Sequence, residues 1–400
     1  MIEWMQKAKE IEKWMTEQRR FLHQHAEVGF ALHETKAYVK QQLIVMGYTP
    51  VECGKMGLVA LAGGKHPGKT FLLRADMDAL PIREEADVDF ACPNGTMHAC
   101  GHDLHTAMLL GAAKLLKAYE DEICGTVKLM FQSAEEIFEG AQNMVDAGLL
   151  ENPAVDAAMM IHVMAGMPIS AGTVIVSAPG VSAPAADYFS IKVQGKGCHG
   201  SAPHAGVDAL TAAAHILIAL QELHARELPA SAEAVMTIGS FHGGSASNVI
   251  ADSAELGGTI RTYDEETRIY LKQRLSEISN SIAGAFRASA EVIFGSGCPT
   301  LVNDAALCSD VERYLAGSFP VLSAAALASS GKAARGGGSE DFAYVSQEVP
   351  ALMLALAAGE PEKGYPYPQH HPKVKFDESV LPVGAAVFAQ TATKWLEEHQ

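Results

Sequence analysis

The chain has 400 residues, of which 48% are hydrophobic and 19% charged, so it is long enough to bury a large core in two or three domains. Its formal net charge of -17 argues against nucleic acid as a partner, because an acidic protein repels a phosphate backbone. No run approaches the roughly 20 apolar residues of a membrane helix, so we expect no membrane span.

Cysteine usage and the first residues predict a cytoplasmic protein. The chain has 7 cysteines and no CxxC pair, which predicts reduced thiols rather than a disulfide framework or a zinc ribbon. Charged residues interrupt the N-terminal segment too often for the apolar core of a signal peptide.

Up to about residue 183, helical and strand patterns alternate. The predicted elements are helices at 8–25 and 34–46, strands at 58–61 and 70–75, a helix at 105–119, a strand at 126–131, a helix at 139–147 and a strand at 157–161. Such alternation predicts an α/β fold with a mostly parallel sheet that is covered on both faces.

A segment rich in Pro and Gly at 178–184 predicts a linker. The elements predicted after it are a strand at 187–193, a helix at 207–225, strands at 233–241 and 254–262, and a helix at 265–288. This βαββαβ-like order predicts a smaller α+β (ferredoxin-like) domain, inserted at 185–296. Residues 1–184 and 297–400 then form the catalytic domain, and the Ala/Gly-rich stretch at 324–338 is predicted to be a loop.

Acidic and histidine side chains gather where three predicted strands end. The first strand is followed by Asp76 and Asp78, the second by Glu135 and Glu136, and the third by His162. Ligand sites in open α/β sheets lie at the carboxyl ends of strands, so three such clusters predict a metal or acid/base site. Taken alone, the two adjacent glutamates are equally consistent with a solvated turn.

The densest cluster is the segment from His98 to His105, which reads His-Ala-Cys-Gly-His-Asp-Leu-His. Thiol, imidazole and carboxylate groups together suit zinc, and also manganese, cobalt or nickel. Ionisable groups at this density are costly to bury unless they bind something, which favours a metal site over a structural role. The two outer histidines could instead be hydrogen-bond partners of the ligands.

Short motifs occur along most of the chain, from Arg-Arg-Phe-Leu-His at 19–23 to near the C-terminus. They are Arg-Ala-Asp-Met-Asp-Ala-Leu-Pro at 74–81, Met-His-Ala-Cys-Gly-His-Asp at 97–103, Ala-Glu-Glu at 134–136, Gly-Lys-Gly-Cys-His-Gly at 195–200, Asn-Val-Ile at 248–250, Gly-Ser-Glu-Asp-Phe at 338–342 and His-His-Pro at 370–372. With these motifs the chain resembles the dinuclear-metal amidohydrolases of the aminoacylase and carboxypeptidase type. The most similar branch contains hippurate hydrolase, N-acyl-amino-acid amidohydrolases and auxin-conjugate hydrolases.

The resemblance implies two divalent metal ions, zinc or manganese and also cobalt or nickel. It implies that Cys100 bridges them as a thiolate, and that the remaining ligands are His102, Glu136, His162 and His370.

Further expected roles concern the proton transfer and the residues that support the ligands. Glu135 is implied to be the general base and later the acid, while Asp76, Asp78 and Asp103 are expected to support the ligands through hydrogen bonds.

The inserted domain is implied to bind substrate and to form a homodimer. His199 is expected to be catalytic, reaching the site of the partner subunit, while Asn248, Arg261 and Gly338 are expected to contact the substrate. Five positions depart from the usual pattern of the branch, which leaves the shape of the acyl pocket open: Ala26, Leu104, Ser133, Cys198 and Ala251.

The expected activity is hydrolysis of the amide bond of a small N-acyl amino acid or peptide-like substrate. The alternative enzyme is a dinuclear dipeptidase, aminopeptidase or carboxypeptidase on the same scaffold. Nucleophilic catalysis by Cys100 leaves Glu136 and the distant histidines without a role. The third alternative is a metal-stabilised binding protein without catalytic activity, in which Glu135 would have no role.

Overall fold

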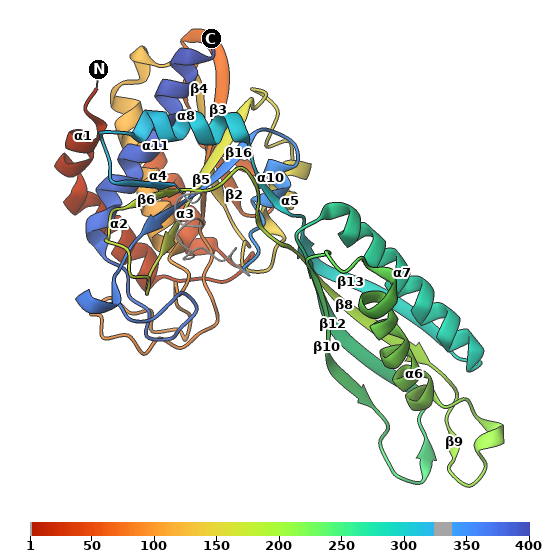
Figure 1. Ribbon diagram of the computed structural model, residues 1–400. Coiled ribbons are helices and arrows are strands. Elements are labelled where there is room, and N and C mark those ends of the chain that lie inside the picture. The colour runs from red at the N-terminus through yellow and green to blue at the C-terminus, as the bar shows by residue number, and fades with distance from the viewer. Residues whose placement is uncertain (1, 324–337) are drawn as a thin grey trace. The chain divides into compact units, whose positions relative to one another are not determined.

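The computed structural model describes residues 2–323 and 338–400, which form two compact units (Figure 1). Of the described residues, unit 1 holds 2–182, 302–323 and 340–400, and unit 2 holds 183–301 together with Gly338 and Ser339. Except for Gly338, the loop predicted at 324–338 lies outside the described residues. Within the described part, no helix has the length and hydropathy needed to cross a membrane.

Unit 1 is built on an eight-stranded sheet in the order β1-β2-β4-β3-β5-β16-β6-β15. Its strands are β1 (Val51–Cys53), β2 (Gly57–Gly63), β3 (His66–Asp76), β4 (Cys124–Gln132), β5 (Ala157–Met164), β6 (Val174–Val176), β15 (Val321–Ser323) and β16 (Ala351–Ala357). The central strands β4, β3, β5 and β16 are parallel, and antiparallel pairs lie on either side of them. The predicted α/β fold with a mostly parallel sheet is confirmed.

Strand β3 shows why the centre of this sheet is parallel. It is exposed over its first four residues and buried from Thr70 to Asp76. A continuous buried run is typical of a parallel strand with both faces covered, because crossover helices pack on each side. The last residue of this strand, Asp76, therefore lies in the interior of unit 1.

The helices of unit 1 correct two predicted boundaries. They are α1 (Trp4–Glu10), α2 (Glu12–Gln24), α3 (His33–Val45), α4 (His102–Ala118), α5 (Gly140–Asp146), α8 (Ala305–Leu315), α10 (Ala343–Ser346) and α11 (Leu381–Glu398). The single helix predicted at 8–25 was wrong, because the chain breaks at Ile11, whose N–H bonds Ala8 only three residues back. Helix α4 begins at His102 rather than at residue 105, so this histidine belongs to its first turn.

Unit 2 is a four-stranded antiparallel sheet in the order β10-β12-β8-β13 with two main helices (Figure 1). Its main elements are β8 (Ala185–Gln194), α6 (Ala209–Glu222), β10 (Ala234–Gly243), β12 (Ser253–Thr262), α7 (Glu265–Ala285) and β13 (Ser289–Cys298). The βαββαβ succession with this strand order is ferredoxin-like, as predicted. A small ribbon joins β9 (Cys198–His199) to β11 (Val249–Ile250).

The segment predicted to be an irregular linker, 178–184, contains the short strand β7 (Gly180–Ala183). A second short strand, β14 (Leu301–Asn303), occurs where the chain returns to unit 1. Short 3-10 or π turns complete the described structure, at Glu120–Glu122, Pro203–Ala205, Leu223–Glu227, Pro361–Lys363 and Glu378–Val380.

Candidate active site

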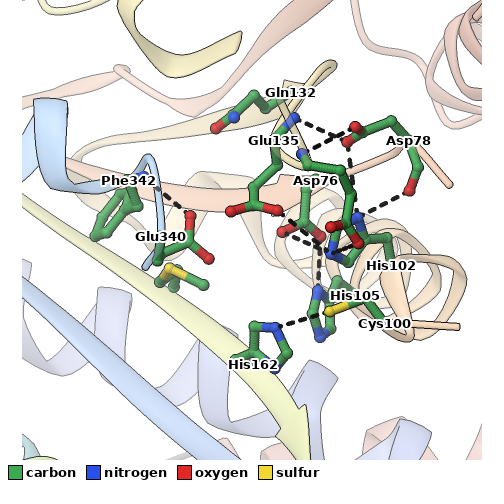
Figure 2. A network of polar contacts seen from close by, with 12 residues as sticks. Asp76, Asp78, Cys100, His102, His105, Gln132, Glu135, His162, Glu340 and Phe342 are labelled. Carbon is green, nitrogen blue, oxygen red and sulfur yellow. Dashed lines mark hydrogen bonds and ion pairs between the residues drawn. The ribbon is translucent and has the colours of Figure 1, made fainter. Parts of the chain in front are cut away.

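The predicted metal ligands of unit 1 gather where β3, β4 and β5 end and α4 begins. Figure 2 shows Asp76, Cys100 and His102 beside one another, with His162 next to the thiol. Strand β5 continues to Met164, so the prediction that it ends just before His162 was wrong. His162 therefore projects from a hydrogen-bonded strand rather than from the loop after it.

A glycine permits the tight turn between Cys100 and His102. Gly101 has φ of 92°, a left-handed conformation that costs a residue with a side chain. A Cβ at this position would lie 2.5 Å from Cγ2 of Val163. Only glycine fits this turn, which brings the thiol and the first residue of α4 to the same site.

A second strained turn separates the two adjacent glutamates. Ala134 has φ of 59°, which is uncommon for a residue other than glycine. The N–H groups of Glu135 and Glu136 donate to the two carboxylate oxygens of Asp78, at 3.0 and 3.1 Å. Asp78, predicted to be a supporting residue, therefore holds the turn that carries both glutamates.

Hydrogen bonds from Nδ1 turn the Nε2 atoms of two histidines toward the proposed metal site. Nδ1 of His102 donates to the carbonyl oxygen of Asp78 at 2.8 Å, and Nδ1 of His162 donates to that of Val163 at 2.7 Å. In the neutral ring each Nε2 therefore carries the lone pair, and that of His162 lies 3.5 Å from the sulfur of Cys100. Among the described residues, the buried Nε2 of His102 has no hydrogen-bond partner, and Oε1 of Glu136 has only the ring of His370 beside it, at 3.5 Å. Buried acceptors of this kind are costly unless a cation pairs with them.

The five predicted ligands fall into two groups that share Cys100. One group joins Cys100 to His102 and His162, and the other joins it to Glu136 and His370. In each group the ligand atoms lie within 4.8 Å of one another. The thiol, imidazole and carboxylate donors fit two divalent cations with one sulfur between them.

The electrostatics favour the thiolate form of Cys100. Burial by itself raises the pKa of the thiol, but His162 and His102 beside it outweigh this effect and lower the pKa to about 6. Burial lowers the pKa of His162, and the sulfur of Cys100 raises it to about 9. Because the thiolate is the form that binds metals, the residue suits a ligand at neutral pH.

The adjacent glutamates differ in their affinity for protons. Burial, followed by the charges of Glu340 and Glu136, raises the pKa of Glu135 well above its usual value. Burial also raises that of Glu136, but a hydrogen bond from His370 and the charge of His102 lower its pKa overall. One carboxyl group is thus suited to hold a proton and the other to remain a carboxylate.

A buried arginine that was given no role from the sequence connects the acidic residues. Arg74 is 1% exposed and donates from Nη1 to Asp76 at 2.7 Å and from Nη2 to Glu340 at 2.8 Å. Gln132 donates to Asp341 at 2.6 Å and accepts from Nε of Arg74. A charged residue inside a predicted buried strand was the signal for this network, because such a residue needs buried partners.

Two further residues support the ligand-bearing segments. Asp103 accepts from Nε of Arg19 at 2.7 Å and from Nδ1 of His23 at 2.8 Å, which ties the start of α4 to α2. His105 donates to Asp76 at 2.6 Å. The distances also group His105 with Asp76 and His102 as possible ligands, but both of its ring nitrogens are already hydrogen-bonded.

Unit 2 holds the predicted substrate-binding residues. His199 is exposed on β9, and its Nδ1 accepts the N–H of Ser201 at 3.2 Å, so the ring proton lies on Nε2. Asn248 is exposed in the neighbouring segment, where its carbonyl oxygen accepts from Gly200 at 2.7 Å. The ribbon therefore brings His199 and the main chain of Asn248 together.

The other two predicted substrate contacts of unit 2 meet at Ser339. Nη1 of Arg261, on β12, donates to Oγ of Ser339 at 3.1 Å. Gly338, next to this serine, is exposed, and within the described structure a Cβ there would meet no atom within 4 Å. No steric constraint of the described structure thus requires glycine at this position.

Together, the fold and the site define a metal-binding α/β hydrolase with an inserted ferredoxin-like unit. The profile of peptidase family M20/M25/M40 matches residues 72–394, and the chain belongs to this family.

Relatives with different substrates cover nearly the whole chain. A thermostable carboxypeptidase from Saccharolobus solfataricus is 37% identical, over 97% of this chain and 96% of the relative. An N-acetyl-L-cysteine deacetylase from Bacillus subtilis is 35% identical, over 98% and 90%. The crystal structure of a dinuclear metal-binding peptidase of the M20 family from Bacillus subtilis has a TM-score of 0.77 at 31% identity, over 97% and 99%.

Proposed function

We propose that the protein hydrolyses the amide bond of N-acyl amino acids, with two divalent metal ions and Glu135 as the general base. The observation that carries the proposal is the gathering of five ligand side chains in two groups that share Cys100, beside the buried carboxyl group of Glu135. Burial and neighbouring charges raise the pKa of Glu135, so its carboxylate has a higher affinity for a proton than Glu136, whose pKa is lowered. Paired carboxyl groups with opposed environments are typical of one catalytic acid/base and one charged ligand.

The proposed ligands are Cys100, His102, Glu136, His162 and His370, with the sulfur shared between the two ions. When bound, such ions lower the pKa of a water molecule and polarise a carbonyl group. Their identity is proposed to be zinc or manganese, with cobalt or nickel as substitutes.

Glu135 moves the proton in this proposal. Its carboxylate accepts a proton from the attacking water and later delivers it to the nitrogen of the leaving amine. General acid–base groups of this kind contribute about 100- to 10,000-fold to the rate. Asp78 positions the base, because it holds the N–H of Glu135 at 3.0 Å.

Residues of unit 2 are proposed to bind the substrate. Nε2–H of His199 is a donor for the oxyanion, and the side chain of Asn248 is a second one. The guanidinium of Arg261 pairs with the free carboxylate of the amino acid, because a guanidinium matches a carboxylate with two parallel hydrogen bonds. Gly338 is proposed to leave room beside this carboxylate.

Peptide hydrolysis is the second candidate, since one relative is a carboxypeptidase. Both activities need a free carboxylate on the leaving half of the substrate, and they differ in the acyl half. A carboxypeptidase accepts a peptide there, whereas an N-acyl-amino-acid hydrolase accepts a small acyl group.

A hydrolysis panel separates the two candidates. N-acetyl, N-benzoyl and longer N-acyl amino acids are compared with dipeptides and blocked peptides, after chelation and again after addition of zinc, manganese, cobalt or nickel. We expect metal-dependent release of the amino acid from N-acyl substrates, and little release when the carboxylate is amidated. Faster cleavage of peptides would favour the carboxypeptidase, and chelator-resistant hydrolysis would contradict both candidates.

We further propose a homodimer in which His199 completes the site of the partner subunit, formed through the inserted domain at about 185–296. The edge strand β10 offers backbone groups to a second copy, as unpaired edges generally do. Mixing Glu135→Gln with His199→Ala chains tests the idea, since one site of each mixed dimer would keep both residues. Verified mixed dimers without recovered activity would exclude the shared site.

The proposed compartment is the cytosol. The seven cysteines, all within the described part of the chain, are free thiols, as expected in a reducing environment.

A further inference from the structure

The main chain of Val163 connects two segments that carry proposed ligands. Its carbonyl oxygen accepts from Nδ1 of His162 at 2.7 Å and from Nε2 of Gln369 at 2.6 Å. Gln369 directly precedes His370 in the sequence. A shift of this one carbonyl would therefore reach both ligand groups that share the thiol.

The N–H of the same residue is held by His105. It donates to Nε2 of His105 at 2.8 Å, and Nδ1 of His105 donates to Asp76 at 2.6 Å. An amide N–H can only donate, so Nε2 must be the acceptor and the ring proton must lie on Nδ1. With both nitrogens engaged, His105 has no lone pair left for a metal ion.

The anchor behind His105 is rigid. Asp76 ends strand β3, and its second oxygen accepts from the buried Arg74 at 2.7 Å. The ring of His105 also packs against those of His102 and His162, with centroids 5.3 and 4.7 Å away. The imidazole therefore links β3 and α4 to the end of β5 inside the core of unit 1.

We propose that His105 is a positioning residue, which fixes the main chain of Val163 and thereby the orientation of His162 and, through Gln369, of His370. The inference rests on the proposed metal centre, and it names His105 as a residue that sets how tightly the centre binds its metal ions. Hydrogen-bond partners behind metal ligands are typically worth about 10- to 100-fold in metal affinity.

Two substitutions separate the bonds of His105. The amide nitrogen of Asn stands near the position of Nδ1, so His105→Asn can keep the bond to Asp76 and loses the acceptor for Val163. Gln reaches the position of Nε2, so His105→Gln can keep that acceptor and loses the bond to Asp76. If the residue acts through Val163, Asn should weaken metal binding more than Gln.

The readout is zinc affinity, measured by competition with a chromogenic chelator, together with thermal unfolding of the metal-free protein. We expect His105→Asn to bind its weaker zinc ion about 10- to 100-fold less tightly, with a smaller loss for His105→Gln. Thr106→Val is the matched control, because it removes a buried bond of 2.7 Å to the carbonyl of Asp76 from the same helix. It should lower the unfolding temperature and reduce the zinc affinity less than His105→Asn does, because the bond that it removes does not reach Val163.

The hydrogen bond from Gln369 to the carbonyl oxygen of Val163 allows a test of coupling with His105. Gln369→Met keeps the volume of the side chain and removes its bond to Val163. Because both side chains act on the same main chain, the loss in the double variant with His105→Asn should be smaller than the product of the single losses.

Three results would overturn the inference. In the first, His105→Asn folds and binds zinc as tightly as the parent. In the second, both His105 variants lose one ion completely, which would make His105 itself a ligand. In the third, the parent chain binds no divalent ion, and the proposed function fails together with the inference.

Discussion

The two units present their functional residues in opposite ways. In unit 1 the side chains of Asp76, Asp78 and His102 are buried and tied to neighbouring segments. In unit 2 His199 is exposed on a two-stranded ribbon, and Asn248 is exposed directly before the second strand of that ribbon. Buried ionisable groups require partners, so unit 1 contains most of its site already, whereas the residues of unit 2 are available to a partner from outside.

This contrast separates two kinds of failure. A change among the proposed ligands should remove metal, because it takes away a donor atom of a metal ion. A change on the exposed ribbon should leave the metal in place and affect only turnover or substrate binding. The predictions test this separation, from the largest expected effect to the smallest.

Glu135→Gln should retain both ions and lower kcat by about 100- to 10,000-fold, because the amide keeps the shape and cannot accept the proton. The measurement is steady-state kinetics together with elemental analysis of the purified variant. The comparison variant is Glu136→Gln, which should lose metal as well. An active Glu135→Gln enzyme would exclude this residue as the base.

His199→Ala should lower kcat by about 100- to 1,000-fold, the usual effect of losing one oxyanion donor. Its metal content and unfolding temperature should match those of the parent, since the ring is exposed and unit 2 carries no proposed ligand. Loss of metal from this variant would contradict the proposal that unit 1 holds the metal ions and unit 2 contributes only to substrate binding and turnover.

Arg261→Met should lower kcat/KM for N-acyl amino acids. The loss of transition-state binding energy should be about 1.5–3 kcal/mol, the range for a hydrogen bond to a charged group. The defect should shrink when the carboxylate of the substrate is amidated. Arg226→Met, on an exposed turn of the same unit, is the control and should behave like the parent. An equal loss on both substrates would mean that Arg261 does not bind the carboxylate.

Gly338→Ala should change the free energy of unfolding by less than about 0.5 kcal/mol, as for an exposed position without special backbone geometry. No described atom would clash with the new methyl group. A raised KM with unchanged chemical denaturation would support a contact with substrate. A strongly destabilised variant would show that glycine is needed for the fold instead.

Much of unit 1 was predictable because its signals are local. The buried run before Asp76 marked a parallel strand, and the Cys/His/Asp segment marked the start of α4 to within three residues. The structure brings the five ligands predicted from the resemblance into two groups sharing Cys100. Their roles as ligands remain predictions that the metal analyses address.

The supporting contacts were less accessible from the sequence. His105 bonds Val163, which is 58 residues away, and Arg74 bonds Glu340, which is 266 residues away. Composition and periodicity do not encode such pairings, which depend on how strands align in the sheet. The break at Ile11 was missed for a different reason, since the apolar spacing continues through it and only the backbone changes.

The most direct test of the shared sulfur is the metal content of Cys100→Ala, measured by elemental analysis after dialysis against zinc or manganese. The parent chain should hold two ions per subunit, and the variant should hold one or fewer with little turnover, while His199→Ala retains both ions. A Cys100→Ala protein with two ions and full activity would contradict the account.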